Sequence, residues 1–402
     1  MKVVQINTVP NGSTGSIMMN IHKYLQKNGH DSYVVWGRGR KSNNKNEIYM
    51  NDFIGVYFHA IYSRITGKVG FGSKRATKKL LKKLDMIKPN IIHLHNIHGY
   101  YINIELLFNY IKENKIRLIW TLHDCWAFTG HCTHFDSIHC DKWKSNCDNC
   151  PIKKEYPMSL IDSSKWCFNK KKELFSNIDN AIIITPSEWL ANNVRKSFLN
   201  KYEVRVINNG VDTTIFKKID KSKLSFRTKY NLDKKIIILG VAAPFTIKKG
   251  FDNFIELSKI LDENYTIVLV GLSEKQLKKI PKNILGIKRT SNIDELVDIY
   301  NSADVFLNLS VEETYGLTCV EAMSCGTPCI AYDRTSLSEL MKKYNGLLVK
   351  KDNNSIESLK QIIETLNVNK KNTNKIDDDI EIMCSKYMKE YCKIGGNYEK
   401  NS

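Results

Sequence analysis

The sequence predicts an α/β protein that consists of two doubly wound, parallel-sheet domains of the Rossmann type. Short apolar segments, typical of buried parallel strands, alternate along the chain with segments of helical pattern. The length of 402 residues suits two domains, since a domain usually has roughly 100–200 residues. A hydrophobic content of 42% is enough to fill two sizeable cores.

The first predicted domain covers residues 1–208. It opens with a βαβ unit, in which strands over residues 2–9 and 32–36 flank a helix over residues 17–26. Further buried strands are predicted over residues 90–94, 118–122, 181–185 and 204–208.

The second predicted domain covers residues 209–366, with helices that include 252–261 and 294–302. Its strands are predicted over residues 236–242, 265–270, 305–309 and 328–331. Residues 367–402 should form a polar segment and a C-terminal helix or tail that packs back on the first domain. Ligands of open α/β sheets bind beyond the carboxyl ends of the strands, so we expect the two domains to face a central cleft that holds the site.

Positive charge is concentrated in the first half of the chain. Residues 1–208 hold 31 Lys and Arg against 16 Asp and Glu. This half therefore supplies most of the net charge of +19 that the whole chain carries. The densest cluster covers residues 64–88, where leucines at helical spacing accompany nine basic side chains. A basic amphipathic helix is typical of a membrane surface, so contact with anionic lipid is one interpretation and a solvated face is the other. Aromatic side chains do not interleave with the basic ones, which disfavours nucleic acid.

The sequence indicates a cytoplasmic protein that is peripheral at the inner face of the cell membrane. Its apolar runs fall short of the ~18–20 residues of a membrane span. The N-terminal segment lacks the charged and then apolar pattern of a signal peptide. We expect the eleven cysteines to be reduced thiols in that compartment, or metal ligands where they cluster.

Residues 125–151 form a long insertion in the first domain that is rich in cysteine. Four thiols in one loop suit a structural zinc ion, although one of the spacings is long for a zinc ribbon. Free thiols and a redox role are the alternatives. The four candidate ligands are Cys132, Cys140, Cys147 and Cys150.

Polar residues follow several predicted strands of the first domain. A Gly-rich loop that contains Gly15 follows the first strand, and His95 and His123 follow two later strands. A lone histidine is more often structural, but two imidazoles at strand ends favour binding of a sugar hydroxyl or a phosphate.

The segment 313–328 carries the strongest functional signal. It follows the predicted strand at 305–309, turns at Gly316 and continues as a helix. A helix N-terminus suits a phosphate, while Glu313 and Glu321 can accept hydrogen bonds from hydroxyl groups. An anion site beside two hydroxyl acceptors predicts a nucleotide sugar as the ligand. A pair of glycosidase carboxylates is the weaker interpretation, because both residues lie beside the anion site on one domain.

These motifs resemble the retaining glycosyltransferases of family 4, which have the two-domain GT-B fold. In the second domain the resemblance is carried by Glu313-x7-Glu321 with its neighbours, by Ser302–Phe306, by Asn209–Asp212 and by Lys248-Lys249-Gly250. In the first domain the chain resembles the subgroup of capsular, colanic-acid-type and other exopolysaccharide synthesis, through residues 12–15, 93–101, 121–126 and the cysteine loop.

The resemblance implies a role for each matching residue. Glu313 would hold the hydroxyls of the donor sugar, Lys249 would neutralise the leaving pyrophosphate, and His95 would touch the sugar near the reacting carbon. Glu321 would hold the ribose. The backbone N–H groups of Tyr315, Gly316 and Leu317 would face the donor, Lys248 would replace an arginine that the family usually carries, and Gly15 and His123 would line the acceptor side of the cleft.

The implied reaction is hexosyl transfer with retention, from a UDP or GDP sugar to a hydroxyl of a polyprenyl-pyrophosphate-linked glycan in cell-surface polysaccharide synthesis. The resemblance implies that no catalytic metal or other cofactor is required, and an Asp-x-Asp motif at a strand end is lacking from the sequence. The alternatives are a non-hydrolysing epimerase with the same fold and a non-catalytic binding module at the membrane surface.

Overall fold

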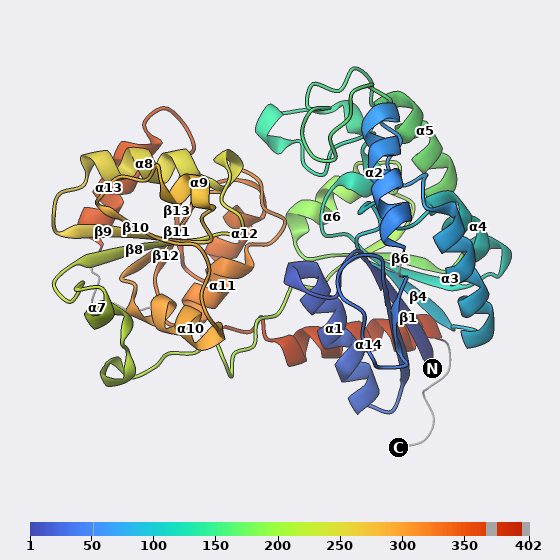
Figure 1. The fold of residues 1–402 in the computed structure, drawn as a ribbon, viewed down its shortest axis with the longest axis horizontal. Coiled ribbons are helices and arrows are strands. Elements are labelled where there is room, and N and C mark those ends of the chain that lie inside the picture. Colours follow the sequence, from blue (N-terminus) through green and yellow to red (C-terminus); the bar gives the residue numbers. More distant parts are fainter. Residues whose placement is uncertain (51, 367–375, 396–402) are drawn as a thin grey trace. The chain divides into compact units, whose positions relative to one another are not determined.

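The computed structural model describes residues 1–50, 52–366 and 376–395 (Figure 1). The chain forms two compact units. Unit 1 consists of Met1–Asn208 together with the C-terminal segment from Glu381, and unit 2 consists of Asn209–Ile380. The predicted polar segment at 367–375 and the tail after residue 395 lie outside the described residues.

Unit 1 contains a seven-stranded parallel sheet in the order β3-β2-β1-β4-β5-β6-β7. The strands are β1 (Lys2–Asn7), β2 (Asp31–Trp36), β3 (Glu47–Tyr49), β4 (Ile91–Leu94), β5 (Arg117–Thr121), β6 (Ala181–Thr185) and β7 (Glu203–Val206). The helices are α1 (Gly12–Lys27), α2 (Phe53–Thr66), α3 (Lys74–Ile87), α4 (Ile104–Glu113), α5 (Ser164–Phe175), α6 (Glu188–Arg195) and α14 (Ile380–Gly395). Three short 3₁₀ turns at 126–128, 136–138 and 142–144 lie in the cysteine-rich insertion.

Unit 2 contains a six-stranded parallel sheet in the order β10-β9-β8-β11-β12-β13. The strands are β8 (Ile236–Val241), β9 (Tyr265–Val270), β10 (Ile284–Ile287), β11 (Val305–Asn308), β12 (Cys329–Tyr332) and β13 (Leu347–Val349). The helices are α7 (Phe226–Lys229), α8 (Phe251–Ile260), α9 (Glu274–Leu277), α10 (Ile293–Ser302), α11 (Leu317–Ser324), α12 (Thr335–Lys343) and α13 (Ser355–Thr365).

The central strands of both sheets are apolar because helices cover both faces. β4, β11 and β12 are buried at every position, which is why they appear in the sequence as continuous apolar runs. In each sheet the strand order reverses at one point, between β1 and β4 in unit 1 and between β8 and β11 in unit 2. Ligands of doubly wound sheets bind beyond the carboxyl ends of the strands at such a point.

Two predicted details of unit 1 are wrong. Helix α1 begins at Gly12, five residues before the predicted start, so the predicted Gly-rich loop is its first turn. Glycine and serine weaken a helical pattern, although a first turn tolerates them. The basic cluster at 64–88 is divided between two helices, since α2 ends at Thr66, where Gly67 caps it with φ 71°, and α3 begins at Lys74.

The C-terminal helix α14 packs on the sheet of unit 1 (Figure 1). The hydroxyl of Tyr391 lies 2.6 Å from Nδ1 of His93, on β4, and Nε2 of the same imidazole lies 2.8 Å from the Thr121 hydroxyl. The Tyr387 hydroxyl lies 3.1 Å from the same threonine oxygen. All four side chains are buried, so this helix completes the hydrogen bonding of the sheet's interior.

Within the part of the chain that the structure describes, we find no helix that is both long and apolar enough to cross a membrane.

We predict that Tyr391→Phe lowers the free energy of unfolding by about 1–3 kcal/mol, because it leaves a buried imidazole nitrogen without its partner. Urea unfolding of the full chain measures this change. Tyr110→Phe is the matched control, since the Tyr110 hydroxyl bonds Asp85 in an exposed position. Equal effects of the two variants would contradict the structural role of Tyr391.

Candidate functional site

The candidate site of unit 2 begins at the N-terminus of α11. Gly316 precedes this helix with φ 100°, and a Cβ atom there would lie 2.9 Å from Cδ2 of Leu337. Glycine is therefore required by the backbone angle and by the close packing. The helix start has no side-chain cap. Its first N–H groups and the positive end of the helix dipole suit an anionic ligand.

A second loop, which follows β8, is held against the first. The N–H of Val311 donates to the carbonyl of Lys248 at 2.9 Å. Gly250, with φ 78°, permits close contact, because a Cβ atom there would lie 2.5 Å from Cβ of Leu309. These contacts bring the loops after β8 and β11 together at the point where the strand order reverses.

Two lysine–glutamate pairs connect the loops. Nζ of Lys249 lies 2.5 Å from Oε1 of Glu313, and their side chains are 35% and 17% exposed. Nζ of Lys248 lies 2.9 Å from Oε2 of Glu312, whose side chain is only 3% exposed. The structure thus joins predicted site residues from two distant segments. It also shows that the charge of Lys248, predicted to replace an arginine, is offset by a buried carboxylate.

The backbone of Glu313 is fixed by the start of α12. Its N–H donates to the hydroxyl of Thr335 at 3.1 Å, and its carbonyl accepts from the hydroxyl of Ser336 at 3.0 Å. Sequence reasoning missed these two positioning residues. Their only signal is a Thr-Ser pair where a helix begins, which is typical of many helices that have no functional role.

Tyr315 is anchored by its side chain. The ring is buried, and its hydroxyl donates to Asp378, a residue that also lies 2.7 Å from Nζ of Lys343. The side chain therefore holds the loop in place, and the backbone N–H is the part of this residue that remains suited to a ligand. Asp378 lies 63 residues away in sequence, and the sequence does not indicate the pairing.

Glu321 lies in the second turn of α11 and is half-buried. Burial raises the pKa of its carboxyl group to about 7, although the hydrogen bond that Oε2 accepts from the Tyr300 hydroxyl at 2.7 Å opposes the shift. Above this pKa the carboxylate is a pure acceptor, which suits the hydroxyl groups of a ribose. Tyr300 is a further residue that sequence reasoning missed.

The structure places His95 in the interior of unit 1. The side chain is only 1% exposed, with Nδ1 3.0 Å from Nε2 of His123 and Nε2 3.2 Å from Oε1 of Gln5. Because a carbonyl oxygen only accepts, His95 donates from Nε2, and His123 donates to its Nδ1. Burial lowers the pKa of both imidazoles, that of His123 to about 4, so both are neutral. Their predicted roles at a donor sugar and an acceptor stay predictions.

A third imidazole lies beside this buried pair. Nε2 of His98 is 2.8 Å from Oδ2 of Asp124, and its Nδ1 is 3.1 Å from the hydroxyl of Tyr156. Burial acts to raise the pKa of Asp124, but His98 and the N–H of Trp126 outweigh it, so the pKa is lowered. The arrangement can hold and orient a proton at a strand end. The signal in the sequence is that both residues lie shortly after predicted strands, His98 four residues after the strand at 90–94 and Asp124 two residues after the strand at 118–122.

Gly15 has a packing role that accounts for its identity. A Cβ atom there would lie 2.5 Å from the carbonyl carbon of Pro10, so only glycine permits the loop after β1 to lie against α1. Its predicted position on the acceptor side stays a prediction.

The four loop cysteines line one small hollow. All are free thiols, and burial raises the pKa of three of them, that of Cys147 to about 11. The N–H of Gly130 donates to Sγ of Cys147 at 3.1 Å. In the described ranges we find no group of three or more His, Cys, Asp or Glu side chains arranged to hold a metal ion. A structural zinc ion at these cysteines therefore stays a prediction.

A buried lysine holds the cysteine loop against α5. Nζ of Lys171 donates to the carbonyl of Trp126 at 2.6 Å and lies 4.0 Å from the centroid of the indole ring. Burial lowers the pKa of this ammonium group to about 8, although nearby thiols oppose the shift. The residue is thus bonded to a carbonyl and an aromatic face rather than to a carboxylate.

The chain belongs to Glycosyltransferase Family 4, whose family model matches residues 14–215. Residues 222–380 match the model of Glycosyl transferases group 1. The predicted membership of glycosyltransferase family 4 is therefore confirmed, and the protein is a glycosyltransferase. Retention at the anomeric carbon stays a prediction.

Individual relatives are distant but similar over nearly the whole chain. The putative colanic acid biosynthesis glycosyl transferase WcaC of Escherichia coli K12 is 23% identical over 370 residues, which cover 88% of each protein. Among solved structures, sucrose-phosphate synthase from Thermosynechococcus elongatus has a TM-score of 0.70 at 14% identity, and HepE of Anabaena in complex with UDP-glucose has 0.69 at 14%. Both alignments cover 97% of this chain and 98% of the other. These likenesses confirm the predicted GT-B fold.

We predict that Glu321→Gln stabilises the protein more at high pH than at low pH. The folded-state pKa of about 7 lies above the ordinary value of 4.5, so the folded protein keeps a proton that the unfolded chain releases between these values. Stability of the wild type therefore falls as pH rises through this window, and glutamine removes the effect. The melting temperature of the variant relative to wild type should rise by roughly 2–8 °C between pH 5 and pH 8.

Glu274→Gln is the control for this pH experiment. Its carboxyl group is exposed beside Lys288, which lowers its pKa, so the relative stability of this variant should not rise with pH. If the melting temperature of Glu321→Gln relative to wild type does not change with pH, the pKa of the Glu321 carboxyl group is not raised.

The zinc prediction has a direct test. Elemental analysis of protein purified without chelators should give about one zinc per chain if the four cysteines bind the ion, and Cys150→Ser should lower this content. Zinc-free protein with eleven titratable thiols after unfolding would instead establish that all the cysteines are free.

Proposed function

We propose that this glycosyltransferase moves a hexosyl group from a UDP or GDP sugar to a hydroxyl of a polyprenyl-pyrophosphate-linked glycan, with retention at the anomeric carbon. The observation that carries the proposal is the Lys249–Glu313 pair beside the N-terminus of α11. It combines a cation, a carboxylate and a helix dipole at one strand-order reversal, which are the groups that a pyrophosphate and sugar hydroxyls require.

The proposed step is a substitution at the anomeric carbon. The bond between this carbon and the phosphate oxygen breaks, and its electron pair leaves with the nucleoside diphosphate. The acceptor hydroxyl forms the new bond on the same face of the sugar, and its proton ends on the leaving phosphate. Lys249 and the N-terminus of α11 stabilise the negative charge that develops on the leaving group, and preorganised charge is usually the largest catalytic contribution.

Each carboxylate of the site has its own proposed partner. Glu313 holds hydroxyls of the donor sugar. Its side chain is partly exposed, and its backbone N–H and carbonyl are both hydrogen-bonded to side chains at the start of α12. Glu321 holds the ribose hydroxyls. The backbone N–H groups of Tyr315, Gly316 and Leu317 bind the donor, and the chemistry requires no metal or other cofactor.

The proposed pathway is synthesis of a cell-surface polysaccharide at the inner face of the membrane. It is supported by the similarity to WcaC over most of both chains. A nucleotide-sugar donor is supported by the fold shared with HepE, which was solved with UDP-glucose. A lipid-linked acceptor places the protein at a membrane surface, which the basic first half of the chain favours.

We predict that Glu313→Gln and Lys249→Met each lower transfer to the acceptor by at least about 100-fold, while the melting temperature changes little. Steady-state transfer assays with a panel of UDP and GDP sugars measure the loss. A shift in melting temperature on adding each donor first shows which one binds. EDTA should leave the wild-type rate unchanged.

The matched control is the Lys288–Glu274 pair, an ion pair of equal length that is exposed on unit 2. Lys288→Met and Glu274→Gln should leave transfer within about twofold of wild type. Wild-type rates in Glu313→Gln or Lys249→Met would remove that residue from the site. Donor conversion without any acceptor would indicate an epimerase instead.

A further inference from the structure

Helix α2 has the opposite distribution of polar and apolar side chains from an ordinary surface helix, which buries its apolar face. Its buried side chains are the polar residues His59 and Ser63. Its exposed side chains are apolar or aromatic, with exposed fractions between 37% and 78%. They are Phe53, Ile54, Tyr57, Phe58, Ile61, Tyr62 and Ile65.

Polar contacts fix this orientation of the helix. Nδ1 of His59 lies 2.9 Å from the hydroxyl of Ser73, and the N–H of Gly72 donates to its Nε2 at 3.0 Å. The hydroxyl of Ser63 donates to the carbonyl of Lys68 at 3.5 Å. The helix cannot rotate its apolar side chains inward without breaking these hydrogen bonds, so the exposure is built into the fold.

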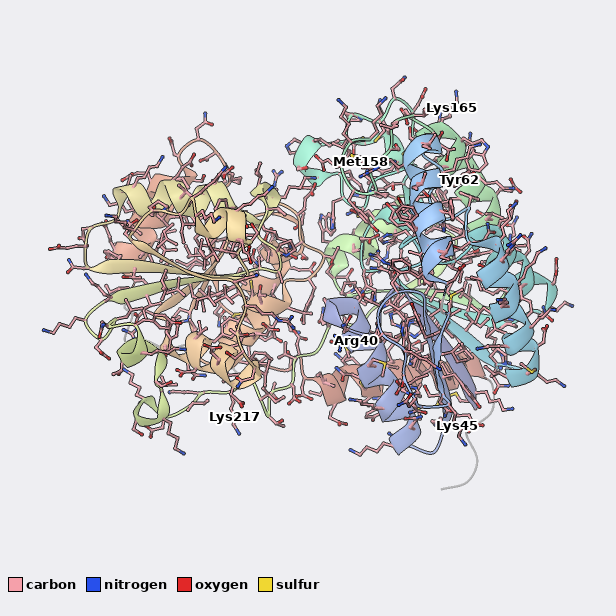
Figure 2. The ribbon with its side chains drawn as sticks, viewed as in Figure 1. Arg40, Lys45, Tyr62, Met158, Lys165 and Lys217 are labelled. Atoms are coloured by element: carbon pink, nitrogen blue, oxygen red, sulfur yellow. The ribbon has the colours of Figure 1, made fainter. Side chains whose placement is uncertain are left out.

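A second segment extends the apolar surface. The N–H of Leu160 donates to the carbonyl of Arg64 at 2.7 Å, and the hydroxyl of Ser163 donates to the carbonyl of Thr66 at 2.6 Å. Met158, Leu160 and Ile161 are exposed on this segment. Figure 2 shows Tyr62, Met158 and Lys165 at the same end of unit 1. We call the seven exposed α2 residues and these three residues the α2 face.

An apolar surface of this size is unusual on a protein that stays in water. Soluble monomers rarely expose a contiguous apolar patch larger than a few hundred Å² unless something binds there. Tyrosine prefers the boundary between water and hydrocarbon, because its ring is apolar and its hydroxyl is polar, and phenylalanine favours the apolar side of an interfacial helix. Tyrosine and phenylalanine supply four of the ten members of the α2 face.

Basic side chains surround the α2 face. Residues 52–79 and 153–166 together hold nine Lys and Arg against three Asp and Glu. Nζ of Lys68 lies 4.3 Å from the ring centroid of Trp166, which is exposed beside the face. Arg64 and Lys165 are exposed as well. A surface that is apolar in its centre and positive around it fits an anionic bilayer.

We propose that the α2 face inserts into the headgroup region of an anionic membrane. Self-association is disfavoured by charge, because a two-fold pairing of this face would bring two basic surrounds together. The acidic headgroups of a bilayer neutralise the same charges. This inference adds a docking surface to the proposed function and rests on it only for the location of the acceptor.

The inserted element differs from the one that the sequence favours. The leucine stripe of α3 packs into the core, with Leu80 and Leu84 buried, and the lysines of this helix point to solvent. Helix α3 therefore supplies only positive charge. The apolar side chains that would enter the bilayer belong to α2. Most of this helix precedes the basic cluster in sequence.

Vesicle binding by the full chain tests the proposal. Wild-type protein should sediment with vesicles of phosphatidylcholine and phosphatidylglycerol and much less with phosphatidylcholine alone. Ile54→Ser with Phe58→Ser should weaken binding by about tenfold or more, since two large exposed side chains no longer enter the bilayer. Arg64→Glu with Lys165→Glu should also weaken vesicle binding. The loss should be largest at low salt, because salt screens the attraction between these side chains and the headgroups.

The controls separate docking from folding and from catalysis. Met86→Ser and Ile293→Ser remove exposed apolar side chains elsewhere and should leave vesicle binding unchanged. All variants should keep their melting temperatures and their transfer rate to a water-soluble acceptor. Wild-type binding in the Ile54/Phe58 variant would overturn the proposal. So would a dimer, seen by analytical ultracentrifugation, that the same variant dissociates, because the face would then join two copies of the chain.

Discussion

The hydrogen bond from the N–H of Val311 to the carbonyl of Lys248 joins the two loops on which the site of unit 2 depends. β8 and β11 are neighbours in the sheet, but the loops that follow them are more than sixty residues apart in sequence. Gly250 permits their backbones to touch at Leu309. Without this contact Lys249 would lose Glu313, and the N-terminus of α11 would have no cation beside it. The charges of the site are therefore positioned by main-chain packing.

The charged side chains of the site contribute little to the free energy of folding. A partly exposed ion pair such as Lys249–Glu313 contributes roughly 0–1 kcal/mol to folding. Glu321 is destabilising when ionised, since burial raises its pKa. Side chains that stabilise little or even destabilise are typical of places where a ligand is bound, because the ligand's own charges and hydroxyls complete the hydrogen bonding. The site is preorganised by the groups that hold it, including Thr335, Ser336 and Tyr300.

Unit 1 reverses the usual distribution of polar and apolar groups in two places. His93, His95 and His123 lie inside it, where burial keeps them neutral and hydroxyl or imidazole partners satisfy them. Helix α2 exposes its apolar side chains and buries a histidine and a serine. Both arrangements are costly in water unless specific contacts compensate. The interior contacts are visible in the structure, and the exterior ones are what a membrane would supply.

The sequence by itself determined the fold class, because strands buried on both faces appear as apolar runs between helical segments. It also determined the local part of the site, since Glu313, Gly316 and Glu321 lie within nine residues on one strand-loop-helix segment. The tertiary structure decided which distant residues meet, such as Lys249 with Glu313 and Tyr315 with Asp378. It also decided that His95 is buried and that α2, not α3, exposes its apolar side chains. Periodicity shows which side chains share a face of a helix, but only packing decides whether that face meets the core or the surface.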